Sequence, residues 1–87
     1  MSAEVLTEKY IAAVEETVKN LQRAQGSITV SEECVNEVVG YVEAYLADSK
    51  YFRAQKRFET SLTSIAYCEG LLDALKLFGA VKNASLT

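Results

Sequence analysis

DSKYFRAQKRFETSLTSIAYCEGLLDALKLFG, residues 48–79, contains the end of one helix, a basic turn and a complete second helix. Beyond the turn, apolar residues recur at spacings of three and four, which is typical of one helix face. These residues are Phe58, Leu62, Ile65, Ala66, Leu72, Leu75 and Phe78. Gly79 follows the last of them, at the position where a glycine commonly ends a helix. The pattern predicts a helix over about 57–78, after a turn formed by AQKR.

The segment before the turn is also predicted to be helical, over about 31–55. Val35, Val38, Val42 and Tyr45 form one stripe, and Val39 and Leu46 lie beside it. Five valines between positions 30 and 42 are compatible with a strand, but strict alternation is absent, so the spacing favours a helix. Its N-terminus has two candidate caps: Thr29, which forms a capping box with Glu32, and Ser31.

A first helix is predicted over about 3–25. Ile11, Val14, Val18 and Leu21 recur at helical spacing with charged residues between them. Ser2 is the expected N-cap, and Gly26 is expected to end the helix.

Composition supports the same class. The chain has 87 residues, of which 49% are hydrophobic and 24% charged, with no proline and only four glycines, so the turn residues that sheets need are scarce. We expect one all-α domain over residues 1–87, an up-and-down three-helix bundle in which each helix buries its stripe. The tail 80–87 is expected to fray.

The antiparallel register of the last two helices also concerns the cysteines. A turn near residue 56 places Cys34 level with residue 77 or 78, about ten residues from Cys68. That separation is on the order of 15 Å, against the roughly 7 Å between Cα atoms that a disulfide tolerates. Both thiols are therefore expected to be free. Together with the lack of an export signal or transmembrane stretch, this indicates a cytoplasmic protein.

The residues that most enzymes depend on are scarce. There is no histidine, no CxxC pair and no glycine-rich phosphate loop. We expect no catalytic activity, no cofactor and no metal centre. The charge is uneven: residues 1–49 carry −6 and residues 50–87 carry +3, which give the net −3. A dipolar chain of this kind suits association between helices better than general nucleic-acid binding.

Residues 45–79 resemble the archaeal family catalogued as domain of unknown function 357. The family pattern is an aspartate before a small residue and Tyr-Phe, a polar turn, an aromatic residue, and then Tyr-Ala-x-Gly-x-Leu-Asp-Ala. Here the matching positions are Asp48, Ser49, Tyr51, Phe52, Phe58, Tyr67, Cys68, Gly70, Leu72, Asp73 and Ala74. Ser49 and Cys68 replace the usual alanines, and the turn lacks the glycine-acid pair of relatives. The resemblance implies a small three-helix bundle and no established activity.

A polar set is the first candidate site: Asp48, Tyr51, Tyr67 and Asp73, with Glu69 beside them. The register brings Asp48 within one turn of Tyr67, so a hydrogen bond between them is expected to join the two helices. A pocket for a small ligand or a hard cation is the functional alternative. Glu69 and Asp73 form no catalytic pair with a positioned nucleophile.

Gly70 is expected inside a helix, where it costs roughly 1 kcal/mol relative to alanine. We attribute it to close packing against an aromatic ring near Tyr41 and Val42, which predicts that Gly70→Leu lowers the melting temperature.

The basic patch consists of Lys50, Arg53, Lys56 and Arg57. It is expected to complement the helix dipole and to pair with acids of the first helix. The alternative ligands are RNA or another polyanion, and an acidic protein surface.

Five tyrosines are more than a bundle of this size can enclose, which favours interfaces, including a homodimer. We therefore expect a non-catalytic interaction module that presents the last two helices, around Asp48, Tyr51 and the basic turn, to a protein partner or to itself. The alternatives are an RNA- or polyanion-binding accessory domain and a small-ligand or cation-binding bundle. No membrane partner is expected.

Overall fold

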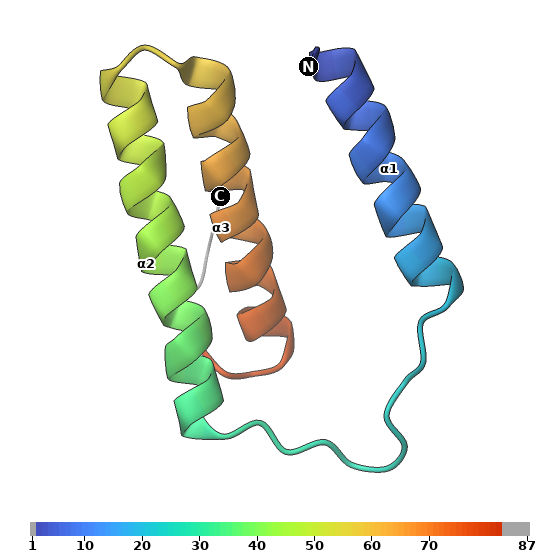
Figure 1. Cartoon of the computed structure of the whole chain (residues 1–87). Coiled ribbons are helices and arrows are strands. Elements are labelled where there is room, and N and C mark those ends of the chain that lie inside the picture. Colours follow the sequence, from blue (N-terminus) through green and yellow to red (C-terminus); the bar gives the residue numbers. More distant parts are fainter. Residues whose placement is uncertain (1, 83–87) are drawn as a thin grey trace.

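Three helices and no strand make up the described residues 2–82 of the computed structural model (Figure 1). They are α1 (Ala3–Lys19), α2 (Glu32–Ala54) and α3 (Phe58–Leu77). Successive helices run in opposite directions, so the predicted all-α class and the up-and-down course are confirmed. Residues 83–87 of the tail that was expected to fray lie outside the described part.

The boundaries of α2 and α3 agree with the predicted 31–55 and 57–78 to within one residue. Of the two candidate caps, Ser31 is the one used: its Oγ accepts a hydrogen bond of 3.1 Å from the Cys34 amide. That bond satisfies one of the amides that a helix start leaves without a partner. Ser2 caps α1 in the same way, as predicted, through the Val5 amide.

The turn between α2 and α3 is closed by a helix-ending motif with a lysine where glycine is usual. The Arg57 amide donates to the Phe52 carbonyl at 2.9 Å, and the Lys56 amide donates to the Arg53 carbonyl at 2.9 Å. This pair of bonds requires a left-handed backbone conformation at Lys56, whose φ is 61°. Gly79 occupies the equivalent position after α3, with φ of 74°.

The α2–α3 hairpin contains every buried residue of the described chain. Val42 and Ser49 of α2 face Ser61, Cys68 and Leu75 of α3. Within each helix these residues are seven apart, which is the spacing of a seam between paired helices. The core is therefore narrow: one line of mostly small side chains along which the two helices approach.

A reciprocal serine pair joins the helices near the turn. Ser49 Oγ donates to the Ser61 carbonyl at 2.9 Å, Ser61 Oγ donates to the Ser49 carbonyl at 2.7 Å, and the two hydroxyls are 3.0 Å apart. Both serines are buried, so each hydroxyl depends on the other helix for its hydrogen bonds. The pair fixes the antiparallel register, with residue 49 level with residue 61.

Helix α1 ends earlier than predicted, at Lys19 rather than Gln25. The Asn20 side-chain amide donates to the Glu16 carbonyl at 3.0 Å and to the Glu16 carboxylate at 2.8 Å, which caps the helix. Beyond Leu21 the apolar repeat stops, so another turn of helix would add no apolar contact. Gly26 instead lies within the extended connection 20–31, with φ of 79°.

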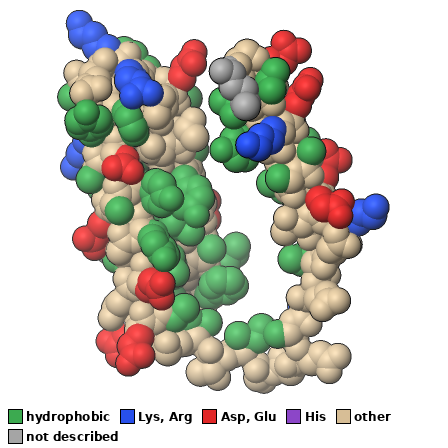
Figure 2. Space-filling view, in the orientation of Figure 1, with side chains coloured by type: hydrophobic (Ala, Val, Ile, Leu, Met, Phe, Trp, Pro, Cys, Tyr) green, Lys and Arg blue, Asp and Glu red, His purple; other side chains and the backbone are tan. Residues whose placement is uncertain are grey.

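The expected burial of the α1 stripe is absent. No Cα of α1 lies within 8 Å of a Cα in α2 or α3, and no residue of α1 is buried. In Figure 2 the two parts are separated by open space, joined only through the connecting loop. The radius of gyration is 15.6 Å, against about 12 Å for a compact chain of this length. The described helices include none that is both long and apolar enough to cross a membrane.

Candidate interaction surface

The predicted polar set does not form a network. Asp48 is exposed, and among the described residues no hydrogen bond joins it to Tyr67. The Tyr67 ring packs instead on the Tyr45 ring, with centroids 4.5 Å apart, and Tyr67 is 53% exposed. The Tyr51 hydroxyl accepts a hydrogen bond of 2.8 Å from Gln55 in its own helix, and Asp73 is exposed. The predicted link between the helices is therefore wrong.

The serine pair, which the pattern analysis missed, makes that link. Asp48 immediately precedes Ser49, so the helix directs Ser49 to α3 and turns the aspartate outward by about 100°. A signal was present in the sequence: small residues at positions 61 and 68 continue to Leu75 with a spacing of seven. Such spacing marks the close seam between two helices.

The predicted close packing at Gly70 is also wrong. A Cβ built on it meets no atom within 4 Å, and the residue is exposed. It is thus not required for close helix packing, and the predicted loss of melting temperature in Gly70→Leu loses its steric reason. Gly40 in α2 is equally open.

The basic patch lies at the turn end of the hairpin. The Arg57 guanidinium is 4.9 Å from the centre of the Phe52 ring, a cation–π contact that holds this cation against its own hairpin. Lys50 and Arg53 lie on the last turns of α2. The expected pairing with acids of the first helix has no support, because α1 is not packed against the hairpin.

One side of the hairpin carries a shallow apolar groove that reaches the basic patch. We call it the Leu46 face. It is lined by Leu46, Ser49, Lys50, Arg53, Phe58, Ser61, Leu62 and Ile65. Phe58 is 62% exposed and Leu62 67% exposed, so large apolar side chains stand in solvent here. Cationic side chains lie beside them along the α2 edge.

The other side of the hairpin, the tyrosine face, is defined by Tyr41, Tyr45 and Tyr67. Toward the open end of the hairpin it continues into a groove lined by Val30, Cys34, Val35, Val38, Leu71, Ala74, Leu75 and Phe78. Tyr45 and Leu46 follow the buried Val42 by three and four positions, which places them on either side of the core. The hairpin is therefore apolar on both faces.

The titratable groups of the hairpin do not point to a reactive centre. Burial raises the pKa of the Cys68 thiol, and the nearby carboxylates of Asp48 and Glu69 raise it further. Its Sγ donates to the Val42 carbonyl at 3.4 Å. Since the thiolate is the nucleophile, a raised pKa keeps this cysteine unreactive near neutral pH. A hydrogen bond to the Glu37 carboxylate raises the pKa of the exposed Tyr41 hydroxyl.

Metal-ligating side chains do not gather in the part of the chain that the structure describes: no three His, Cys, Asp or Glu residues meet there. Both cysteines are free thiols, as predicted, with Cys34 exposed and Cys68 buried.

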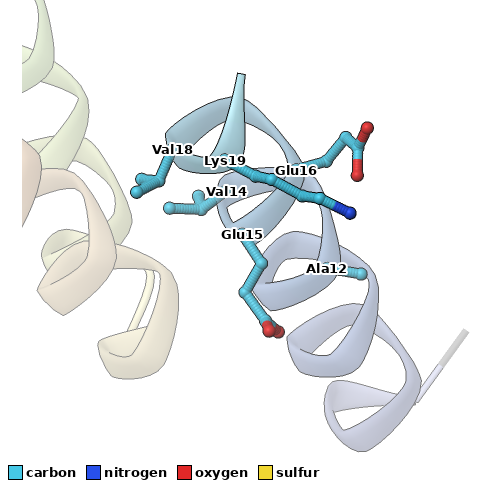
Figure 3. Close-up of a pocket in the computed structure, with 6 residues that line it drawn as sticks. All are labelled: Ala12, Val14, Glu15, Glu16, Val18 and Lys19. Atoms are coloured by element: carbon cyan, nitrogen blue, oxygen red, sulfur yellow. The ribbon is translucent and has the colours of Figure 1, made fainter. Parts of the chain in front are cut away.

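The hollow along α1 in Figure 3 has no opposite wall. It is lined only by α1 residues, namely Ala12, Val14, Glu15, Glu16, Val18 and Lys19. Val14 and Val18 point toward the hairpin, whereas Glu16 and Lys19 point away from it. Side chains of one helix cannot enclose a small ligand, so this hollow is one side of an incomplete helix–helix contact.

A family model described as "Protein of unknown function (DUF357)" matches residues 9–81, which include most of α1 and the whole hairpin. No curated protein and no solved structure matches the chain.

Proposed function

Because this chain belongs to the DUF357 family, which is described only as proteins of unknown function, we propose its role from its surface: it is a non-catalytic helical interaction module. The module presents the apolar faces of the α2–α3 hairpin to a protein partner. An archaeal source and a cytoplasmic location are part of the same proposal. They rest on the family resemblance and on the two free thiols.

The observation that supports this role is the area of uncovered surface. The chain exposes 7617 Å², whereas a folded monomer of 9.6 kDa exposes about 5,100 Å². The excess of roughly 2,500 Å² exceeds the approximately 800 Å² that each partner contributes to a stable interface. This excess includes the surfaces that α1 and the hairpin leave uncovered toward each other. Large apolar side chains of the hairpin are exposed within it, among them Phe58, Leu62 and Tyr67. Contiguous exposed apolar side chains mark interaction sites on protein surfaces.

The test is capture from native lysate by the tagged full chain, with and without nuclease. Leu62→Asp places a charge on the Leu46 face. Ala44→Asp places the same charge on the exposed side of α2 opposite the seam, and serves as the matched control. We expect a defined protein, which includes further copies of the chain, to be retained by wild type and by Ala44→Asp, and lost by Leu62→Asp in both nuclease conditions.

Two results would overturn the proposal. One is a wild-type chain that stays monomeric and retains nothing. The other is retention of RNA alone, lost on nuclease treatment and in a variant with alanine at all four basic-patch positions. That second result would replace the module with the polyanion-binding alternative.

A further inference from the structure

The hairpin has two apolar faces, and the chain has one helix free to cover them. If α1 closes on its own hairpin, its stripe covers either the tyrosine face or the Leu46 face, and the other stays in solvent. Helix geometry forbids one helix from covering both, because the faces lie on opposite sides of the seam. Covering the second face therefore requires a surface from outside the chain.

The edge of the Leu46 face is self-complementary in charge. Glu43, Leu46 and Lys50 follow one another at spacings of three and four, so they form one exposed stripe on α2. When two such stripes run antiparallel about Leu46, each Glu43 lies opposite a Lys50. When they run parallel in register, like charges lie opposite each other. The stripe thus selects an antiparallel second copy.

Charge is distributed along the whole hairpin in the same direction as along this stripe, from an acidic end to a basic end. Its turn end carries the basic patch, and its open end carries Glu32, Glu33 and Glu37 on α2. These ends are about 30 Å apart along a rigid helix, so they do not neutralise each other within one hairpin. In an antiparallel pair each basic end lies at the acidic end of the second copy, and association is favoured electrostatically.

We infer that the protein forms a two-fold symmetric dimer through its Leu46 faces. The two α2 helices cross antiparallel at Leu46, and Glu43 of each copy pairs with Lys50 of the other. The two hairpins together make a four-helix arrangement, with Leu62 and Ile65 of both copies in the shared core. This inference rests on the proposed function, since it names the partner of the same hairpin surface. The tyrosine face then remains for α1.

Charge reversal on the full chain tests the pairing. The masses of wild type, Glu43→Lys and Lys50→Glu are measured by size-exclusion chromatography with light scattering over a range of concentrations. Glu15→Lys, on exposed α1, makes the same change of net charge as Glu43→Lys and is the control. We expect wild type and the control at twice the chain mass of 9.6 kDa. Each hairpin reversal should raise the dissociation constant by at least about tenfold, because like charges then meet twice.

Restoration distinguishes the proposed pairing from simple charge repulsion. An equal mixture of Glu43→Lys and Lys50→Glu chains should form heterodimers of near wild-type affinity, since every pair is again of opposite charge. The double variant E43K/K50E should form homodimers for the same reason. Circular dichroism of each variant checks that the helices are intact.

A wild-type chain that stays monomeric, a dimer that survives Glu43→Lys, or a mixture that fails to restore association would each overturn the inference. The proposed function fails separately. If the chain is monomeric but still captures another protein in a manner that Leu62→Asp abolishes, the interaction module stands and only the self-pairing is wrong.

Discussion

Helix α1 separates its apolar and charged side chains more cleanly than either helix of the hairpin, yet the hairpin holds every buried residue of the described chain. Val14 and Val18 of α1 are at least 60% exposed, whereas Cys68 and Leu75 of α3 are at most 4% exposed. An amphipathic pattern shows that a helix needs a partner and does not show which one. A short turn and a seam of small residues determine that α2 packs on α3. Helix α1 has neither a short turn to the hairpin nor such a seam.

The largest expected effect separates the two regions directly. Leu75→Ala empties part of the hairpin seam and should lower the free energy of unfolding by about 2–5 kcal/mol. Val14→Ala on α1 removes a side chain that touches no other helix, and should change it by less than about 0.5 kcal/mol. Urea denaturation followed by circular dichroism measures both. A cost for Val14→Ala close to that of Leu75→Ala would show that α1 is packed in solution.

The second prediction concerns the polar contact that α1 lacks. Ser49→Ala removes the hydrogen bond from Ser49 Oγ to the Ser61 carbonyl, whereas the Ser61 hydroxyl keeps its bond to the Ser49 carbonyl, so the variant should cost about 0.5–1.5 kcal/mol. The double variant S49A/S61A should be less destabilised than the sum of the single variants, since the contact of 3.0 Å between the two hydroxyls is already lost in either single variant. Thr63→Ala is the control, because its hydroxyl bonds only within α3. Strict additivity in this cycle would contradict the reciprocal pair.

The third prediction tests the short turn that brings α2 and α3 together and that α1 lacks. Lys56 adopts a left-handed conformation that disfavours residues with a Cβ, so Lys56→Gly should stabilise the fold by about 1 kcal/mol. The neighbouring Gln55 has φ of −88°, and Gln55→Gly should instead destabilise it. Thermal melts of the two variants should therefore shift in opposite directions. A loss of stability in Lys56→Gly would mean that the turn differs from the one described.

The smallest expected effect concerns the outer surface of the hairpin. Gly70 is exposed within α3 with open space around it, so Gly70→Ala should stabilise the fold by about 0.5–1 kcal/mol through helix propensity. Gly79→Ala should destabilise it, because the φ of 74° at that position favours glycine. A lower melting temperature for Gly70→Ala would show that another helix, α1 or a second copy, packs closely on this surface.

The hairpin could be predicted from sequence to within a residue at each boundary. The stripes of 31–55 and 57–78 and the antiparallel register followed from periodicity and one turn. The free thiols followed from that register: Cys34 and Cys68 lie at different levels of the hairpin. These features depend on local spacing, which the sequence contains in full.

Features that depend on the direction of single side chains were harder to predict. The register set by Ser49 and Ser61 places Asp48 level with residue 62, five residues from Tyr67. Neighbouring positions on a helix also differ by about 100°, and Ser49 occupies the inward position. Gly70 suggested a steric contact that the backbone does not make. The candidate site was therefore displaced from a polar network to apolar faces. The location of α1 could not be predicted, because the connection 20–31 is long enough to permit several positions.

Because Cys34 is exposed and Cys68 is buried, a thiol-reactive spin label can be attached to the unsubstituted chain at a single position. A nitroxide reagent attaches at one site per chain, on the first turn of α2, without any substitution. In the antiparallel dimer each label is twelve residues from the crossing at Leu46, so the two labels are separated by about 36 Å along the helix axis. A parallel dimer brings them close together, and a monomer gives no dipolar coupling. Pulsed electron paramagnetic resonance thus measures the orientation of the two copies directly.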